Sequence, residues 1–336
     1  MFARATAAVA SACKPGSRKE ARVSLTIGVD IGGTKVLGGV VDDDGKIIAQ
    51  SRRDTPAVSP AETLARIVEV VTELLVDHDV DSVGIGAAGW IDAERSTVLF
   101  APNLAWRDEP LRDELRKRLR VPVVVENDAN VAAWAEFRFG AAKDADDSMV
   151  MFTLGTGIGG GIVLGGELVR GAHGIAGEMG HVLAVKDGYP CGCGSRGCLE
   201  QYASGKALTR FAREAIVADA KAGERLLADA GGDLTKLNGP MITAAARAGD
   251  QISLDAFEKC GFWLGQGLSD IAQILDPQVL VVGGGVIDAG ELLLEPARRA
   301  YVERLPQRAK LPVANVIGAS MGNTAGVVGA ADLARR

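Results

Sequence analysis

The chain has 336 residues, of which 47% are hydrophobic and 24% are charged, enough for one large domain or two ordinary domains that each bury a core. Its net charge of −6 does not suggest nucleic-acid binding, and no apolar run approaches the roughly 18 residues that span a bilayer. Its five cysteines do not form a secreted disulfide framework, so a protein of the reducing cytoplasm fits best.

Residues 1–22 differ in composition from the rest of the chain. They are rich in alanine and serine and carry a net charge of +4, which leaves −10 for the other residues out of the total of −6. A signal peptide that ends near Ala12 is one interpretation, but its apolar part is short and basic residues follow it. We favour a disordered basic extension, or a start assigned too early.

The first structured segment is predicted to be two strands joined by a glycine turn. Residues 25–31 and 36–41 have buried-strand patterns and flank Gly32-Gly33-Thr34-Lys35. The glycines let backbone N–H groups approach an anion, the Thr and Lys side chains can donate to phosphate, and Asp30 could hold a hydrated magnesium ion. The alternative is an ordinary hairpin that needs glycine at its turn for positive φ.

A helix and a strand lead to a second small-residue turn. Helical periodicity at 62–76 and a strand at 82–86 precede Gly86-Ala87-Ala88-Gly89, which could let a ligand approach. Asn103 follows in a loop, directly after a proline. Its amide could donate to and accept from a hydroxyl, although asparagine at such a place is also a common turn residue.

Residues 121–125 form the next predicted strand, which leads into Glu126-Asn127-Asp128 and an amphipathic helix at about 129–139. Ligands of open α/β sheets gather where strands end. Asp128 is therefore our candidate for a base that takes a proton from a hydroxyl nucleophile. Asp is also a preferred helix N-cap, and the two roles are compatible.

A second strand-glycine-strand unit begins after a charged linker at 143–148. The strand 149–154 runs into Gly155-Thr156-Gly157-Ile158-Gly159-Gly160-Gly161, which repeats the first unit and suggests an internal duplication. The GxxxxGK[ST] pattern of a P-loop is absent, and no dinucleotide-binding βαβ unit follows the G-x-G-x-x-G match at 155–160. The glycine run alone does not specify a nucleotide.

The segment 177–200 contains an unusual concentration of metal ligands. His181, Cys191, Cys193 and Cys198 supply one imidazole and three sulfurs, and glycines among them let the backbone fold tightly. This is a tetrahedral zinc set in which the protein fills all four positions, so the predicted role of Zn²⁺ is structural. A disulfide with spare thiols fits less well, because a Cys-Gly-Cys pair bridges itself only with strain.

Two carboxylates flank this zinc loop. If zinc fixes His181, then Glu178, three residues earlier, is held nearby, and Glu200 follows the last cysteine. Carboxylates and an imidazole can bond several vicinal hydroxyls, which suggests a polyol or sugar ligand. The alternative is that each Glu is a solvated surface charge.

The remaining chain is predicted to be mainly helical. Residues 205–249 are helical with breaks at glycines, and a long helix follows at about 253–275. The strand 279–282 ends in Gly283-Gly284-Gly285, where a flat adenine or ribose could lie against the backbone. Further helices are predicted near 290–304 and 324–335.

Together these motifs resemble the ROK family of repressors and sugar kinases, and the bacterial glucokinases within it. The resemblance covers about residues 25–335, and the zinc loop is its most specific part. The ordered motifs are GVDIGGTK at the start, APNLAW at 101–106, ENDAN at 126–130, TLGTGIGGG at 153–161, GEMGH with CGCGSRGCLE, and VVGGGV at 281–286.

The resemblance implies an actin-like (ribonuclease H-like) α/β fold of two domains, with glucose in the cleft between them and ATP bridging the lobes. It implies a small domain of residues 23–128 plus 319–336, and a large domain of 129–318 that includes the zinc loop at 181–198. Homodimers are common in this family, so a homodimer or homotetramer is expected.

The resemblance also implies a role for each site residue. Asp128 would deprotonate the 6-hydroxyl of glucose, and Asp30 would organise Mg²⁺. The residues that would hold the sugar are Asn103, Asn127, Asp128, Glu178, His181 and Glu200. Those that would line ATP are Gly33, Thr34, Lys35, Thr156 and Gly157 at the phosphates, and Gly284 and Gly285 at the nucleoside.

Two departures from the family pattern flank the expected sugar cleft, and they leave alternatives open. Related glucokinases tend to have proline where this chain has Ala88 and Ala105. A kinase for N-acetylmannosamine, N-acetylglucosamine or another hexose is therefore one alternative. A sugar-sensing repressor is another, but such repressors carry a winged-helix domain before the first strand, and Asp128 is present as a kinase requires. Polyphosphate as donor is disfavoured, because relatives that use it lack this cysteine block.

Overall fold

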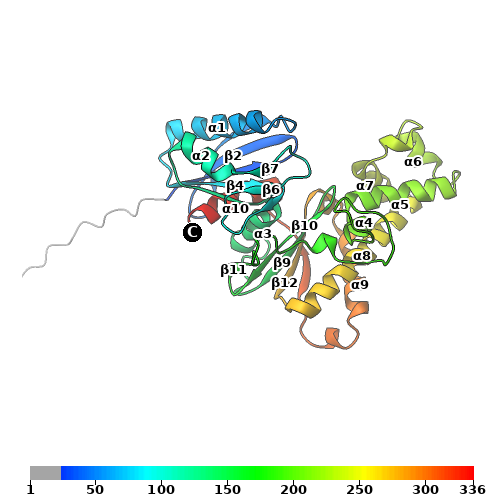
Figure 1. Ribbon diagram of the computed structural model, residues 1–336. Helices are drawn as coiled ribbons and strands as arrows, with labels where there is room; N and C mark the ends of the chain where they lie inside the picture. The colour runs from blue at the N-terminus through cyan, green and yellow to red at the C-terminus, as the bar shows by residue number, and fades with distance from the viewer. Residues whose placement is uncertain (1–23) are drawn as a thin grey trace, which may run out of the picture.

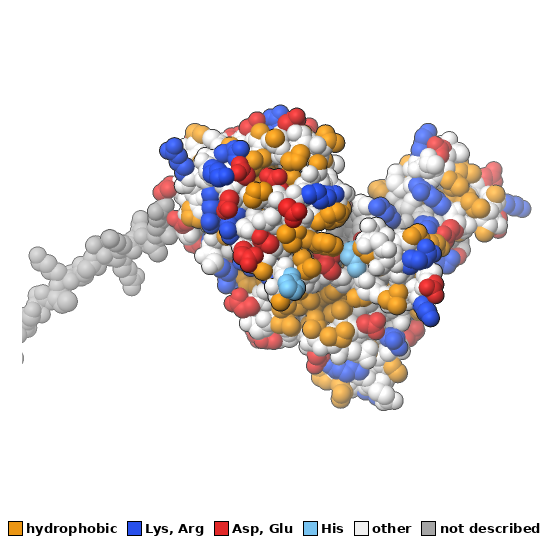
Figure 2. All heavy atoms as spheres, viewed as in Figure 1, with side chains coloured by type: hydrophobic (Ala, Val, Ile, Leu, Met, Phe, Trp, Pro, Cys, Tyr) orange, Lys and Arg blue, Asp and Glu red, His pale blue; other side chains and the backbone are white. Residues whose placement is uncertain are grey.

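The computed structural model describes residues 24–336, which form two lobes built on two five-stranded sheets (Figure 1). The predicted basic extension at 1–22 lies outside the described residues. Within the part of the chain that the structure describes, no helix is both long and apolar enough to cross a membrane. Figure 2 shows a V-shaped hollow between the lobes.

The first sheet has the strand order β3-β2-β1-β4-β8. β1 and β2 form the predicted antiparallel hairpin, β3 continues it, and β4 and β8 run parallel to β1. A small sheet of β5, β6 and β7 extends from β4 toward α2. The bounds are β1 Thr26–Ile31, β2 Lys35–Val41, β3 Ile47–Asp54, β4 Ser82–Ala87, β5 Trp90–Ile91, β6 Val98–Phe100, β7 Arg107–Glu109, α2 Leu111–Leu119 and β8 Val123–Asn127.

Helices cover both faces of the first sheet. α1 (Pro60–Asp77) starts after the N-cap Ser59 and packs with α2 on one face. On the other face α10 (Ala325–Ala334) lies directly on the strands, because Gly28 and Gly84 have no side chain there. A Cβ on either glycine would lie 1.8 Å from a carbonyl oxygen of α10. The last helix of the chain therefore completes the lobe that the first strands begin.

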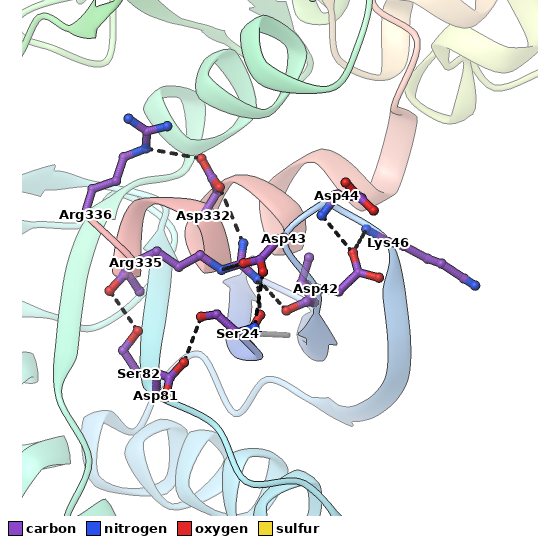
Figure 3. A network of polar contacts seen from close by, with 12 residues as sticks. Ser24, Asp42, Asp43, Asp44, Lys46, Asp81, Ser82, Asp332, Arg335 and Arg336 are labelled. Atoms are coloured by element: carbon purple, nitrogen blue, oxygen red, sulfur yellow. Dashed lines mark hydrogen bonds and ion pairs between the residues drawn. The ribbon is translucent and has the colours of Figure 1, made fainter. Parts of the chain in front are cut away.

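The C-terminus is also fastened to this lobe by polar contacts (Figure 3). Arg335 donates to the Val41 carbonyl at 2.5 Å and lies 3.4 Å from the Asp43 carboxylate. The Ser82 hydroxyl donates to the Ala334 carbonyl at 2.7 Å. These contacts join the end of the chain to the strand ends that lie away from the glycine turn.

The second sheet repeats the order of the first, as β11-β10-β9-β12-β13. In both sheets a glycine-turn hairpin is central, an antiparallel edge strand pairs with its second strand, and two parallel strands follow beside its first strand. The two predicted strand-glycine-strand units therefore occupy equivalent places in two sheets of the same order. The bounds are β9 Met149–Leu154, β10 Ile158–Leu164, β11 Glu167–Leu168, β12 Val279–Gly283 and β13 Asn315–Gly318.

α3 (Asp128–Arg138) lies between the two sheets (Figure 1). A Cβ on Gly161 of β10 would lie 2.4 Å from Ala133 of α3, and one on Gly329 of α10 would lie 1.8 Å from the Val131 carbonyl oxygen. Both lobes therefore pack on the helix that begins with the candidate base. The predicted domain boundaries, 23–128 plus 319–336 and 129–318, remain a proposal.

The helices of the second lobe agree broadly with the sequence pattern. The long predicted helix is α8 (Gln251–Leu275), which begins after Asp250 because that side chain accepts from the Ser253 N–H at 2.8 Å. The helical stretch predicted at 205–249 is divided into α5, α6 and α7 near the predicted glycine breaks. The other bounds are α4 Glu200–Ala203, α5 Gly205–Ala218, α6 Glu224–Asp229, α7 Gly239–Arg247 and α9 Glu291–Arg304.

Candidate active site

Strand β8 extends two residues farther than the sequence predicts, and this changes which residue caps α3. Pro122 cannot donate to the ladder, and the pairing with β4 continues as far as Asn127. Asn127 is therefore the N-cap, since its side chain accepts from the Asn130 N–H at 3.0 Å. The prediction that Asp128 precedes and caps the helix is wrong. Asp128 is the first helical residue, and its carboxylate is not committed to the cap.

The environment of Asp128 suits a base. The side chain keeps some accessible surface but lies deep among protein atoms, and its pKa is raised to about 7. Burial is the main cause, and the negative charges of Asp30 and Glu178 add to it. Oδ1 accepts from the Ala129 N–H at 2.9 Å and from the Asn127 amide at 3.1 Å. A carboxylate that titrates near neutrality can take a proton from a hydroxyl at physiological pH.

Asp30 lies at the end of β1, within electrostatic reach of Asp128. Burial raises the pKa of Asp30, and the neighbouring Lys35 ammonium opposes that shift. α10 closes over this carboxylate, because a Cβ on Gly326 would lie 2.8 Å from the Asp30 Cγ. The structure therefore brings the predicted magnesium residue and the predicted base together.

The first glycine turn does not use its glycines as an ordinary hairpin does. Among the described residues, the glycines with positive φ do not include Gly32 or Gly33. A Cβ on either would approach no other atom closer than 3.5 Å, the nearest being the Cβ of Asn103 opposite Gly33. The alternative in which the turn needs glycine for positive φ is wrong. The fold itself does not require glycine at these two positions, so the backbone is open to close approach by a ligand.

The second and third glycine turns meet at the start of α5. The N–H of Gly205, the first residue of α5, donates to the Gly155 carbonyl at 2.9 Å. Gly284 has φ +82°, and a Cβ there would lie 2.4 Å from a carbonyl oxygen at the end of β9. Gly285, like Gly155, would place a Cβ in open space. The predicted phosphate and nucleoside turns are therefore neighbours in the second lobe.

Glu200 connects the second glycine turn to the cysteines. Its Oε2 accepts from the Ile158 N–H at 3.0 Å, and a Cβ on Gly157 would lie 2.3 Å from the same oxygen. Its Oε1 lies 3.6 Å from the Cys191 Sγ. Glu200 is therefore not a solvated surface charge, and that alternative is wrong for this residue.

The four predicted zinc ligands converge. One donor atom from each of His181, Cys191, Cys193 and Cys198 lies within 4.8 Å of the others. The His181 Nδ1 is 3.7 Å from the Cys191 Sγ, and the other two sulfurs are 3.6 Å apart. All cysteines in the described residues are free, so the disulfide alternative is not what the loop forms. Three thiols and one imidazole at this spacing fit tetrahedral Zn²⁺.

His181 joins the cysteine cluster to Glu178. Its Nδ1 faces Cys191, and its Nε2 lies 3.7 Å from the Glu178 Oε2. Burial raises the pKa of Glu178, although His181 and a hydrogen bond from Trp90 on β5 both oppose the shift. Trp90 is a site residue that sequence reasoning missed. Its signal was an aromatic residue with a polar N–H directly after a small-residue turn.

Arg107 is a second missed residue, and it holds the loop that carries Asn103. Its guanidinium donates to three carbonyls of that loop, at Ala101, Leu104 and Trp106. It also lies 4.1 Å from the centroid of the Phe100 ring, a cation–π contact. Arg107 therefore stabilises the loop that places Asn103 opposite Gly33.

Relatives in known proteins cover both lobes. The model of the ROK family matches residues 26–336. The chain is 48% identical over 313 residues to a glucokinase of Streptomyces coelicolor, covering 93% of this chain and 98% of the relative. It is 38% identical over 309 residues to a glucokinase of Thermotoga maritima, covering 91% of this chain and 96% of the relative.

A solved structure extends this likeness to three dimensions. A ROK family glucokinase from Streptomyces griseus, in complex with glucose and AMPPNP, has a TM-score of 0.83 and 49% identity, covering 93% of this chain and 99% of that one. The predicted two-lobed, actin-like α/β fold is thereby confirmed. With the family model matched over nearly all described residues, the chain belongs to the ROK family.

Proposed function

We propose that the protein transfers the γ-phosphoryl group of ATP to the 6-hydroxyl of glucose, with Asp128 as the general base. The observation that carries this proposal is the environment of Asp128, whose pKa is raised to about 7 beside Asp30 and Glu178. Glucokinases with 48% and 38% identity support the same reaction. So does the related structure, which contains glucose and AMPPNP.

The sugar would lie between Asp128 and the zinc loop. Carboxylates and an imidazole accept and donate to vicinal hydroxyls, and Glu178 and His181 present both groups on one side. Asn103, which lies opposite Gly33 in the first lobe, is proposed to contact the sugar from that side. Two further predicted sugar residues have protein partners already: the Asn127 amide donates to the Gly89 carbonyl at 3.0 Å, and Glu200 holds Ile158. We propose that Asn127 and Glu200 also orient the groups to which they are bonded.

ATP would lie along the three glycine turns. Gly33, Gly155 and Gly285 share one property: each would accept a Cβ without a close contact, so nothing within the folded chain explains the glycine. Close approach of the backbone to ATP does explain it. The proposed donors to the phosphates are Gly33, Thr34, Lys35, Thr156 and Gly157, and the proposed nucleoside contacts are Gly284 and Gly285.

The proton step follows from the position and pKa of Asp128. The hydroxyl oxygen of the sugar forms a bond to the γ-phosphorus, the bond from that phosphorus to the bridging oxygen breaks, and ADP leaves. Asp128 accepts the hydroxyl proton. Phosphoryl transfer asks mainly for alignment and charge neutralisation, and a positioned base contributes about 10²–10⁴-fold.

Two metal ions are proposed with different roles. The Asp30 carboxylate beside Lys35 fits Mg²⁺ that is held by one carboxylate, water and substrate phosphates, and such an ion would neutralise phosphate charge. The closed Cys₃His set fits structural Zn²⁺. Through His181 and Glu200, this centre would fix the direction of both carboxylates that flank the loop. The homo-oligomeric state and the cytoplasmic location remain predictions.

The test is ADP formation from magnesium-ATP by the purified protein, with glucose, mannose, fructose, N-acetylglucosamine, N-acetylmannosamine or no sugar. We expect glucose to be preferred, and Asp128→Asn to abolish turnover while glucose still binds by calorimetry. Preference for an N-acetyl sugar would reassign the substrate to the alternative kinase class. Near-normal turnover of Asp128→Asn would remove its role as base. Sugar binding without ADP formation by the wild type would favour a sugar sensor.

A further inference from the structure

A buried ion cluster joins the two lobes beside the start of α3. Glu126 is 2% exposed, and its Oε2 lies 2.7 Å from the Arg170 Nε and 3.1 Å from the Arg95 Nε. The 2.7 Å contact does not have hydrogen-bond geometry, so it is a close charge contact rather than a directed bond. Arg170 follows β11 of the second sheet, whereas Glu126 and Arg95 belong to the first lobe. The cluster therefore crosses between the lobes.

The rest of the Arg170 guanidinium also reaches the first lobe. Its two terminal nitrogens donate to the Ala93 carbonyl at 2.7 Å and to the Asp92 carbonyl at 2.8 Å, both in the turn between β5 and β6. The segment after Arg170 lies against the same turn. Gly174 has φ +82°, and a Cβ there would lie 2.4 Å from the Ile91 carbonyl oxygen. Arg170 and Gly174 thus fasten this segment to the first lobe.

Each side of the contact continues directly into the candidate site. On the first-lobe side, the Glu126 Oε1 accepts from the Asn127 N–H at 2.9 Å and from the Asn130 amide at 3.0 Å. Those bonds fix the first turn of α3, where Asp128 lies. On the second-lobe side, the fastened segment leads to Glu178 within eight residues of Arg170. Arg170 therefore adds a second polar link between the elements that carry these two carboxylates, beside the hydrogen bond from Trp90 to Glu178.

Because the cluster is charged and buried, we infer that it orients the two lobes rather than stabilises the fold. Replacing a buried ion pair with apolar groups is often neutral or stabilising, whereas removing one partner leaves a buried charge unpaired. A planar guanidinium that holds a carboxylate and two carbonyls at once defines an orientation that a single ammonium cannot. The Arg170 guanidinium makes these contacts at the boundary between the two lobes, where it can fix their relative orientation.

We propose that Arg170 is a positioning residue that sets the register between Asp128 and Glu178 across the sugar site. The proposal rests on the function proposed above. Arg170 touches neither substrate nor reacting atoms in this proposal, and it acts through Glu126 and through the β5–β6 turn.

The test compares Arg170→Met with a matched control, Arg112→Met. Arg112 donates to the Glu94 carbonyl of the same turn at 2.7 Å, but it comes from α2 of the same lobe. Because misplacing reacting groups by about 1 Å can cost about 100-fold, we expect Arg170→Met to lower kcat for glucose by about 10- to 100-fold. The KM for ATP should stay unchanged. Arg112→Met should retain wild-type kinetics.

Arg170→Lys keeps the charge but loses the planar fork, so it should recover only part of the lost kcat. If Arg170→Met does not fold, this conservative variant carries the test alone. Wild-type kcat in Arg170→Lys, or in Arg170→Met, would overturn the proposal. So would equal losses in the control variant, since these would show a general requirement of the turn.

Hydrogen exchange separates this proposal from the proposed function. In Arg170→Met, but not in Arg112→Met, the amides of residues 171–177 and of the first turn of α3 should exchange faster. Unchanged exchange there would overturn the register role even if kcat falls. If the wild type phosphorylates no sugar, the proposed function fails, and exchange still decides whether Arg170 couples the two segments.

Discussion

Asp30 and Asp128 lie close enough for the negative charge of Asp30 to raise the pKa of Asp128. Asp30 is the next-to-last residue of β1 and Asp128 begins α3, so the pair exists only because the two strand ends meet at one edge of the sheet. The base is thus tuned by the residue proposed to organise Mg²⁺. A cation placed beside Asp30 would offset the charge that disfavours ionised Asp128.

This relationship predicts a shift in the pH dependence of Asp30→Asn. Asp128 acts as a base only when ionised, so kcat/KM should rise with pH through the Asp128 pKa of about 7. Removing the Asp30 charge removes one of the causes that raise that pKa, so the rise should move to lower pH, together with a lower maximum rate. Asp44→Asn, in the turn at the other end of the hairpin, should leave the profile in place. A rise at unchanged or higher pH in Asp30→Asn would contradict the coupling.

The same raised pKa has a consequence for stability. Between the ordinary value of 3.8 and the folded value of about 7, folded Asp128 holds a proton that unfolded Asp128 releases. The unfolding free energy contributed by this group therefore falls as pH rises through that window and is lowest above it. Asp128→Asn cannot ionise, so it should be more stable than the wild type at pH 8, by about 1–3 kcal/mol after allowance for partial exposure.

Urea unfolding of both proteins at pH 4.5 and pH 8 measures this effect. The advantage of Asp128→Asn should shrink toward pH 4.5, where Asp128 is protonated in the folded protein. If Asp128→Asn is equally or less stable than the wild type at pH 8, then ionised Asp128 does not lower the free energy of unfolding. Loss of turnover together with a gain in stability would show that Asp128 supports activity at a cost in the free energy of unfolding.

Local sequence spacing was enough to predict the parts of the site that lie within one segment. The zinc ligands fall within 18 residues and converge as expected. The glycine turns and the two matching hairpins were also predictable, because strand periodicity and glycine runs are local signals. The strand β3 was not predictable from the sequence, because it lies at the edge of the sheet and its half-exposed pattern mixes charged residues with apolar ones.

The residues that sequence reasoning missed depend on partners far along the chain. Arg170 meets Glu126 across 44 positions, and Trp90 meets Glu178 across 88. No period or short motif relates such pairs; the sheet order and the packing of α3 create them. The Asp128 cap was mispredicted for a related reason. Which residue caps α3 depends on how far β8 pairs with β4, and this pairing is a tertiary contact.

Removal of one metal ligand should affect both metal and sugar. Cys193 is the exposed cysteine of the cluster, so Cys193→Ser disturbs the core least. It should lose bound zinc and, because His181 and Glu200 are then less fixed, also weaken glucose binding. Metal analysis and calorimetry on the same sample measure both. Cys260→Ser, in α8 and outside the cluster, should keep zinc. Full zinc in Cys193→Ser would show that the ligand set is wrong.

The glycines of the third turn should separate a folding role from a ligand role. Gly284→Ala places a Cβ at φ +82° and 2.4 Å from the Leu154 carbonyl oxygen, so it should destabilise the protein. Gly285→Ala places its Cβ where no atom lies within 4 Å, so it should fold normally and raise the KM for ATP several-fold.

Gly239→Ala is the matched control for Gly285→Ala. Gly285 begins a short 3-10 helix, Gly285–Ala289, and Gly239 begins α7. Gly239 likewise has no atom within 4 Å of an added Cβ, but it lies outside the glycine turns. Thermal unfolding should be unchanged or slightly raised in both variants, because alanine reduces the freedom of the unfolded chain by about 0.4–1 kcal/mol. Only Gly285→Ala should change the KM for ATP, while its KM for glucose stays the same. A Gly285→Ala protein with unaltered KM for ATP would place the nucleoside elsewhere.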